Sequence, residues 1–174
     1  MMCVNREEAL HERRPYRGVG LALARCLGGL LLCYAWPLSA HVLSWGDQGD
    51  GTYRNPVLKA DYSDPDVIRV GEDFYLVASE FHFVGIQILH SRDLVNWRII
   101  GQVFDRLEMD AKYDEMRGYA QGTWAPSLRY RDGIFYVYVC TPQDGLFMWH
   151  TKDPAGPWSE MVTVKRVSGW EDPC

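Results

Sequence analysis

Two aspartates stand directly before prolines at places that recur along the chain. The segments are Ser63-Asp64-Pro65 and Glu171-Asp172-Pro173, and Trp124-Ala125-Pro126 has alanine at the corresponding position. If the three prolines mark equivalent places in a repeat, the carboxylates of Asp64 and Asp172 point toward one cavity. Two carboxylates that converge in a pocket supply the acid and base chemistry that cleaves a glycosidic bond.

A simpler interpretation applies to any single Asp-Pro pair. Aspartate accepts a hydrogen bond from its own backbone and proline fixes φ, so the pair readily forms a turn. We expect Asp66 and Asp153 to be turn residues of this kind. For Asp64 and Asp172 both interpretations stay open, because the shared register adds weight to the catalytic one.

The aromatic residues divide in a similar way. Phe81 and Trp124 have no counterpart in the repeat and lie where the mouth of a channel is expected, so stacking on a sugar and packing both fit them. Trp97 and Trp158 recur at one repeat position, which favours packing within the sheets.

The sequence after Ala40 repeats itself at a spacing of about sixty residues. Short runs of Val, Ile, Tyr, Phe and Trp alternate with turn signals, which is typical of strands and hairpins. Corresponding residues lie 60 or 61 positions apart: Phe74-Tyr75 and Phe135-Tyr136, His90 and His150, Asp93 and Asp153, Trp97 and Trp158. Asp132-Gly133 is suited to a tight primed hairpin turn, and Gly71-Glu72-Asp73 occupies the same place in the first repeat.

Each repeat has room for four strands in meander order. Tandem four-stranded units are the blades of a propeller, which pack sheet on sheet around a central channel. A plain β-sandwich is the alternative, but it gives no reason for the matched positions. A third repeat begins at Trp170, so the sequence predicts an all-β chain with two blades and the start of a third, the N-terminal piece of a larger ring.

The charge balance of the chain is acidic. Its 174 residues carry a formal charge of −5, and residues 41–174 contain 13 Lys and Arg against 20 Asp and Glu. Without a basic patch, nucleic acid is excluded as an expected partner. No Cys and His cluster has zinc spacing, and no P-loop or nucleophile elbow occurs, so we expect no metal site.

The N-terminus has the features of a secretory signal. Five arginines lie within residues 1–25, and the fifteen residues that follow are apolar except Ser39. A helix of that length rises ~22 Å, less than the ~30 Å of a bilayer core, which favours a cleaved signal over a retained anchor. We therefore predict a signal peptide over 1–40, a linker over 41–52, a secreted or periplasmic protein, and no stable membrane contact after cleavage.

Two cysteines remain after such a cleavage. Cys140 ends the apolar strand IFYVYVC, and Cys174 is the last residue. A disulfide between them is one possibility, but the position of Cys140 favours a buried, inert thiol.

Three strings in the second part of the chain resemble one known family. NPVLKADYSDPDVIRVGEDFYLVASEFHFVGIQILHSRDLVNW resembles the first blade of glycoside hydrolase family 43, GTWAPSLRYRDGIFYVYV its second blade, and GWEDPC the opening of its third. The resemblance spans residues 53–174. It implies a five-bladed β-propeller, export from the cell, and inverting hydrolysis of glycosides derived from xylan or arabinan.

The resemblance also implies roles for individual residues. Asp64 matches the family's general base, which activates the attacking water, and Asp172 matches the aspartate that orients the general acid and raises its pKa. Phe81 and Trp124 match aromatic positions that wall the subsite for the non-reducing sugar. The general acid is a glutamate of the blade after Asp172, and no residue of this chain matches it.

We therefore expect a glycosidase of β-xylosidase or α-L-arabinofuranosidase type that acts on xylo- or arabino-oligosaccharides without a cofactor. Inverting enzymes hold acid and base about 6.5–9.5 Å apart, a gap that suits opposite walls of a propeller channel. The alternatives are a non-catalytic sugar-binding propeller and an inactive gene fragment. We expect this piece alone to be inactive. The choice between xylose and arabinose, and a structural calcium ion in the complete domain, stay open.

Overall fold

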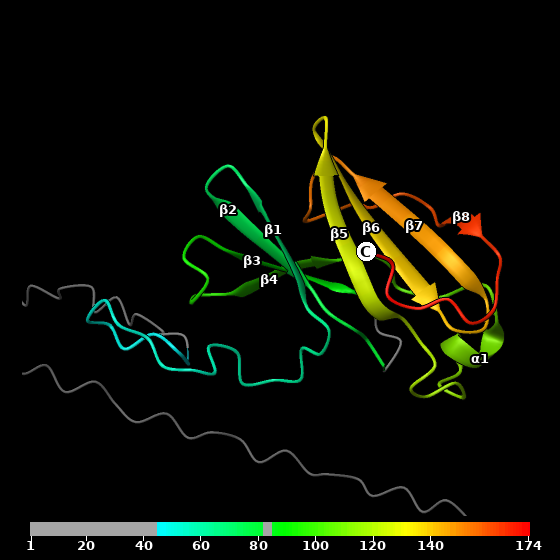
Figure 1. Cartoon of the computed structure of the whole chain (residues 1–174), viewed down its shortest axis with the longest axis horizontal. Helices are drawn as coiled ribbons and strands as arrows, with labels where there is room; N and C mark the ends of the chain where they lie inside the picture. The colour runs from blue at the N-terminus through cyan, green and yellow to red at the C-terminus, as the bar shows by residue number, and fades with distance from the viewer. Residues whose placement is uncertain (1–44, 82–84) are drawn as a thin grey trace, which may run out of the picture. The chain divides into compact units, whose positions relative to one another are not determined.

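The computed structural model describes residues 45–81 and 85–174, which all belong to the compact unit Ala40–Cys174. These residues form two four-stranded antiparallel sheets and one short helix (Figure 1). The elements are β1 (Asp66–Val70), β2 (Asp73–Val77), β3 (Gln87–Ser91), β4 (Arg98–Gln102), α1 (Ala111–Asp114), β5 (Trp124–Arg131), β6 (Ile134–Thr141), β7 (Gly145–Thr151) and β8 (Val162–Lys165). The orders β1-β2-β3-β4 and β5-β6-β7-β8 confirm the two predicted meanders, which we call the first and second blades.

The hairpins that start each blade are set by their turn residues. Asp132 and Gly133 both have left-handed backbones, with φ of 52° and 81°, as a two-residue type I′ turn requires. Gly71 has φ of 64° at the corresponding turn of the first blade. The predicted turns are confirmed, and they fix which side chains of β5 and β6 face each other.

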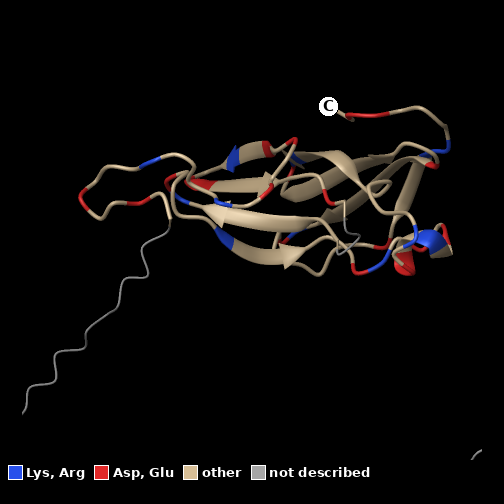
Figure 2. Cartoon of the chain, turned by 90° about the horizontal axis from the view of Figure 1, so that it is seen from below, with Lys and Arg blue, Asp and Glu red and all other residues tan. Residues whose placement is uncertain are grey.

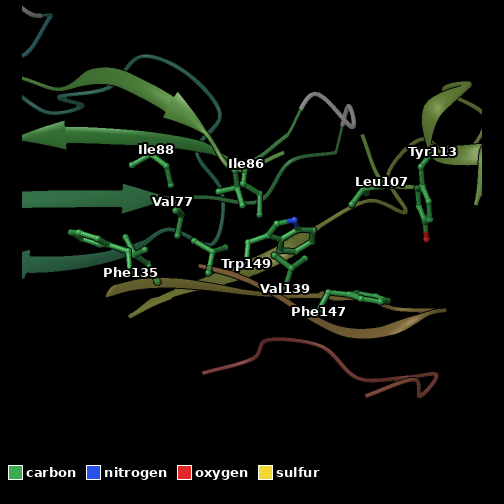
Figure 3. Close-up of a cluster of buried hydrophobic side chains, with 12 residues drawn as sticks. Val77, Ile86, Ile88, Leu107, Tyr113, Phe135, Val139, Phe147 and Trp149 are labelled. Carbon is green, nitrogen blue, oxygen red and sulfur yellow. The ribbon is translucent and has the colours of Figure 1, made fainter. Parts of the chain in front are cut away.

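The two blades share one hydrophobic core. Figure 3 shows Val77, Ile86 and Ile88 of the first blade facing Val139 and Trp149 of the second. All five are buried, with at most 2% of their surface exposed. Trp158 packs against this core and Trp97 against a smaller cluster on the first blade, which confirms packing as the role of that repeat position.

The segment between the blades carries the helix α1, which the repeat does not predict. Asp110 caps its first turn by accepting a hydrogen bond from the Lys112 amide at 2.8 Å. The buried ring of Tyr113 reaches the β6–β7 turn, where its hydroxyl donates to Asp144 Oδ2 at 2.5 Å. This contact attaches the connecting segment to the second blade.

Asp66 connects the two blades, so the expectation that it forms a turn is wrong. It is the first residue of β1, and its Oδ2 accepts the Leu128 amide at 2.8 Å and Arg129 Nη1 at 2.6 Å. β5 is the inner edge strand of its sheet, so the Leu128 amide, which does not bond to β6, finds an acceptor in the neighbouring blade. Asp153 does form the expected turn, because its Oδ1 accepts the Ala155 amide at 2.9 Å.

Charged side chains are interspersed along both sheets and α1, with basic and acidic residues intermixed (Figure 2). Within residues 45–81 and 85–174, no helix has the length and apolar character needed to cross a bilayer. The predicted signal peptide lies outside the described residues.

The Asp66 contact predicts a local effect on hydrogen exchange. Asp66→Ala leaves the Leu128 amide without its acceptor, which costs about 1–3 kcal/mol for a shielded donor. We expect the Leu128 amide to exchange about tenfold faster or more in NMR hydrogen exchange. Glu115→Ala, at an exposed ion pair with Arg117 outside the β5–β6 hairpin, is the matched control and should leave the Leu128 amide unchanged. Equal exchange in both variants would contradict the proposed link.

Candidate active site

The starts of the three repeats share one backbone conformation. Asp64, Ala125 and Asp172 each precede a proline and have φ of 48°, 36° and 50°. A left-handed backbone is uncommon for residues other than glycine, and a following proline restricts the preceding residue further. The same strained geometry at all three places supports the register that the sequence predicted for them.

One buried hydroxyl holds the first two of these starts together. Ser79 follows β2, and its hydroxyl donates to Asp64 Oδ2 at 2.7 Å. The Ser79 hydroxyl oxygen also accepts a hydrogen bond from the Ala125 amide at 2.8 Å. The Ser79 amide in turn donates to the carbonyl of Ser63 at 3.0 Å. Ser79 therefore fixes the Asp64 carboxylate and aligns it with the start of the second blade.

Asp64 and Asp172 line the same cavity. Its volume is about 270 Å³, and its other walls include Ala125, Ser127 and Arg129. Both aspartates are exposed to solvent there. The C-terminal segment, red in Figure 1, passes β5 and brings Asp172 to this place. The structure thus brings together the two carboxylates that the sequence singles out, one from the first repeat and one from the third.

Phe81 and Trp124 lie beside each other at the same end of the blades. Their ring centroids are 6.5 Å apart and their planes meet at 74°. The backbones of Glu80 and Thr123 pair next to them, with the Glu80 amide donating to the Thr123 carbonyl at 3.0 Å. Trp124 directly precedes Ala125, but neither ring is among the residues that line the cavity of Asp64 and Asp172. The aromatic pair is therefore an edge-to-face unit adjoining the carboxylates.

A second cavity of about 430 Å³ continues from Asp172 over β6 and contains Cys140 and Cys174. Both thiols are free, and Cys140 is buried while Cys174 is exposed, as the inert-thiol interpretation predicts. Burial raises the pKa of the Cys140 thiol above its ordinary value, and the carboxylates of Asp172 and Glu171 raise it further. Among the described residues, no group of three or more His, Cys, Asp or Glu side chains is arranged to hold a metal ion.

The sequence profile described as glycosyl hydrolases family 43 matches residues 53–174, which is more than half of the chain. The chain belongs to this family. A putative beta-xylosidase of Xylanibacter ruminicola is 56% identical over 130 residues, which cover 75% of this chain and 24% of that protein. A non-reducing end alpha-L-arabinofuranosidase of Bacteroides ovatus, BoGH43B, is 43% identical over 118 residues, or 65% of this chain and 22% of its own length.

Solved structures of the family share the arrangement of the two blades. The GH43 BlXynB protein of Bacillus licheniformis matches with a TM-score of 0.56 at 33% identity, over 70% of this chain and 26% of that one. The Bacteroides ovatus xyloglucan GH43B structure matches with a TM-score of 0.52 at 39% identity, over 63% and 22%. These likenesses confirm the partial propeller. The chain spans about a quarter of the length of its relatives.

Two functional contacts of this family member were missed from sequence. Ser79 stands at the end of the apolar run FYLVAS, which indicates a buried residue, and a buried hydroxyl needs a hydrogen-bond partner. That signal marks Ser79 as a bonded residue but does not name Asp64 or Ala125. Asp66 was expected to be a turn residue, because its partners Leu128 and Arg129 lie 62 and 63 residues away in the chain.

The position of Asp172 predicts a pH effect on Cys140. Replacing Asp172 with asparagine removes a negative charge that raises the pKa of the Cys140 thiol, so this pKa should fall toward its ordinary value. The readout is the Cβ carbon shift of Cys140 in an NMR titration, with Asp132→Asn as the control. An unchanged midpoint in Asp172→Asn would place Asp172 away from β6.

Proposed function

We propose that this chain forms the base-bearing part of an inverting glycosidase that acts on xylan- or arabinan-derived oligosaccharides. The convergence of Asp64 and Asp172 on one cavity is the observation that carries the proposal. The names of the relatives, beta-xylosidase and alpha-L-arabinofuranosidase, support a pentose glycoside as the substrate. The positions of Phe81 and Trp124 beside the carboxylates support an aromatic wall for the sugar ring.

Asp64 is the proposed general base. Its Oδ2 is held by the Ser79 hydroxyl, so its other oxygen is available to take a proton from a water molecule in the cavity. Transfer of that proton makes the water oxygen a nucleophile toward the anomeric carbon, and the departing sugar receives a proton from the general acid on the other side. This chemistry requires two carboxyl groups and water.

Asp172 is the proposed partner of that acid. The family resemblance assigns the acid to a glutamate of the following blade, and matches Asp172 to the aspartate that orients this acid. A neighbouring negative charge disfavours ionisation of the acid and keeps it protonated near neutral pH. We further propose that the protein is exported through the predicted signal over residues 1–40.

The two aspartates should therefore respond differently to the leaving group. The test joins residues 53–174 to the remaining blades of the Xylanibacter ruminicola relative, which is 56% identical over the shared part. Asp64→Ala should lower kcat about 10²–10⁴-fold on xylobiose and on nitrophenyl xyloside alike, because every leaving group needs the activated water. Asp172→Asn should impair xylobiose strongly and nitrophenyl xyloside less, because nitrophenolate leaves with little protonation.

The pH profile supplies an independent readout. Loss of the Asp172 charge should lower the pKa of the acid and move the alkaline limb of kcat/KM downward in pH. Asp132→Asn, in the exposed hairpin turn, is the control. If both aspartate variants lose the same factor on both substrates and the alkaline limb stays in place, the assigned roles are wrong. Sugar binding without hydrolysis in the unmutated chimera would favour the non-catalytic alternative.

A further inference from the structure

A third hollow, separate from the cavity of Asp64 and Asp172 and from the cavity of Cys140, lies between the blades at their outer strands. Its volume is about 430 Å³, and we call it the outer cleft. Its lining comes from the end of β4 and the segment after it, and from β7 and the segment leading to β8, with Phe104, Glu108, Trp149, Trp158 and Glu160 among its residues. In the first blade, β4 and β1 are the two edge strands, on opposite sides of the sheet. None of the residues that line the outer cleft lines the cavity of Asp64 and Asp172.

The indole nitrogen of Trp158 distinguishes this place from the matching one in the first blade. Trp97 occupies the same repeat position, and its indole N–H donates to the Leu94 carbonyl at 2.9 Å. The repeat counterpart of Leu94 is Ala155. The carbonyl oxygen of Ala155 packs closely against Gly101 of β4, since a Cβ atom added to Gly101 would lie only 2.6 Å from that oxygen. Trp158 Nε1 is buried and has no hydrogen-bond partner within the described part of the chain.

An unmet buried donor is uncommon in a folded protein, because the desolvated group loses about 1–3 kcal/mol. Blade packing does not explain it, since the first blade satisfies the same indole locally. The nitrogen belongs to a residue in the wall of the outer cleft. Because the nitrogen is shielded in this structure, a ligand in the cleft reaches it only when the indole edge turns toward the cleft, and an oxygen-bearing ligand would then supply the acceptor it lacks.

The remaining lining indicates the class of ligand. Phe104 and Trp158 are partly buried and packed against the hydrophobic core, and Phe104 stacks on Trp149 with 4.8 Å between centroids. These rings are therefore held firmly while part of their surface faces the cleft. The carboxylates of Glu108 and Glu160 are exposed and have no ion-pair partner in residues 45–81 and 85–174.

Aromatic surface, carboxylate acceptors and an indole donor together match a saccharide, whose ring has apolar faces and a rim of hydroxyls that donate and accept. The negative carboxylates disfavour an anionic sugar. We propose that the outer cleft binds a neutral oligosaccharide at a site separate from the Asp64–Asp172 cavity. The choice of xylan fragments as ligand rests on the proposed function, and a second site would raise the local concentration of chain segments near the first.

The test measures binding of xylohexaose to the full chain by calorimetry, with the indole N–H signals followed by NMR. Trp158→Phe keeps an aromatic ring but removes the donor and should weaken binding about tenfold, the effect of one hydrogen bond of about 1.4 kcal/mol. Trp97→Phe is the matched control, because that donor is already satisfied within its own blade. Glu160→Gln, on the surface, gives a second variant that does not disturb the core.

The outcomes separate the two sites. Binding that survives Trp124→Ala, weakens in Trp158→Phe and Glu160→Gln, and shifts the Trp158 indole signal supports the outer cleft. Binding that disappears in Trp124→Ala and is unchanged in Trp158→Phe overturns the outer cleft while leaving the hydrolytic proposal intact. Loss of hydrolysis in the chimera with outer-cleft binding retained would count against the proposed function alone.

Discussion

The Ser79 hydroxyl is the contact on which the arrangement of the site depends. It donates to the carboxylate of Asp64 and accepts the amide of Ala125, so one buried group sets the start of the first blade against the start of the second. Both partners have left-handed backbones, a conformation that costs about 1–3 kcal/mol unless surrounding structure holds it. The hydrogen bonds of Ser79 help to stabilise these two backbone conformations, and they also orient the Asp64 carboxylate toward the cavity.

The inner and outer strands of the blades then have different tasks. The segment that leads into β1 supplies Asp64, and the start of β5 supplies Trp124 and Ala125, where a propeller has its central channel. The core between the sheets, formed by residues such as Val77 and Val139, keeps these segments in register. At the outer strands the same packing leaves a cleft with unfilled hydrogen-bonding capacity, which suits recognition more than chemistry.

The sequence predicted the features that repeat and missed those that do not. The 60-residue period predicted two four-stranded meanders, the turn at Asp132-Gly133 and the equivalence of Asp64, Ala125 and Asp172, because each has a local residue signal. The Ser79 bridge joins residues 15 and 46 positions from Ser79, and the Asp66 contacts join residues 62 and 63 positions from Asp66; a sequence records no distance between such partners. Helix α1 lies in a segment without a repeat counterpart, so its single turn had no pattern to reveal it.

The central claim is that Asp64 activates a water molecule and does not itself attack the sugar. Proton NMR of the first sugar released from a β-xyloside by the completed propeller tests this directly, because water attack on the opposite face inverts the anomeric carbon. The account predicts α-xylose as the first product, which then equilibrates with the β anomer. Initial release of β-xylose would mean retention through a covalent glycosyl intermediate, and would contradict the role assigned to Asp64.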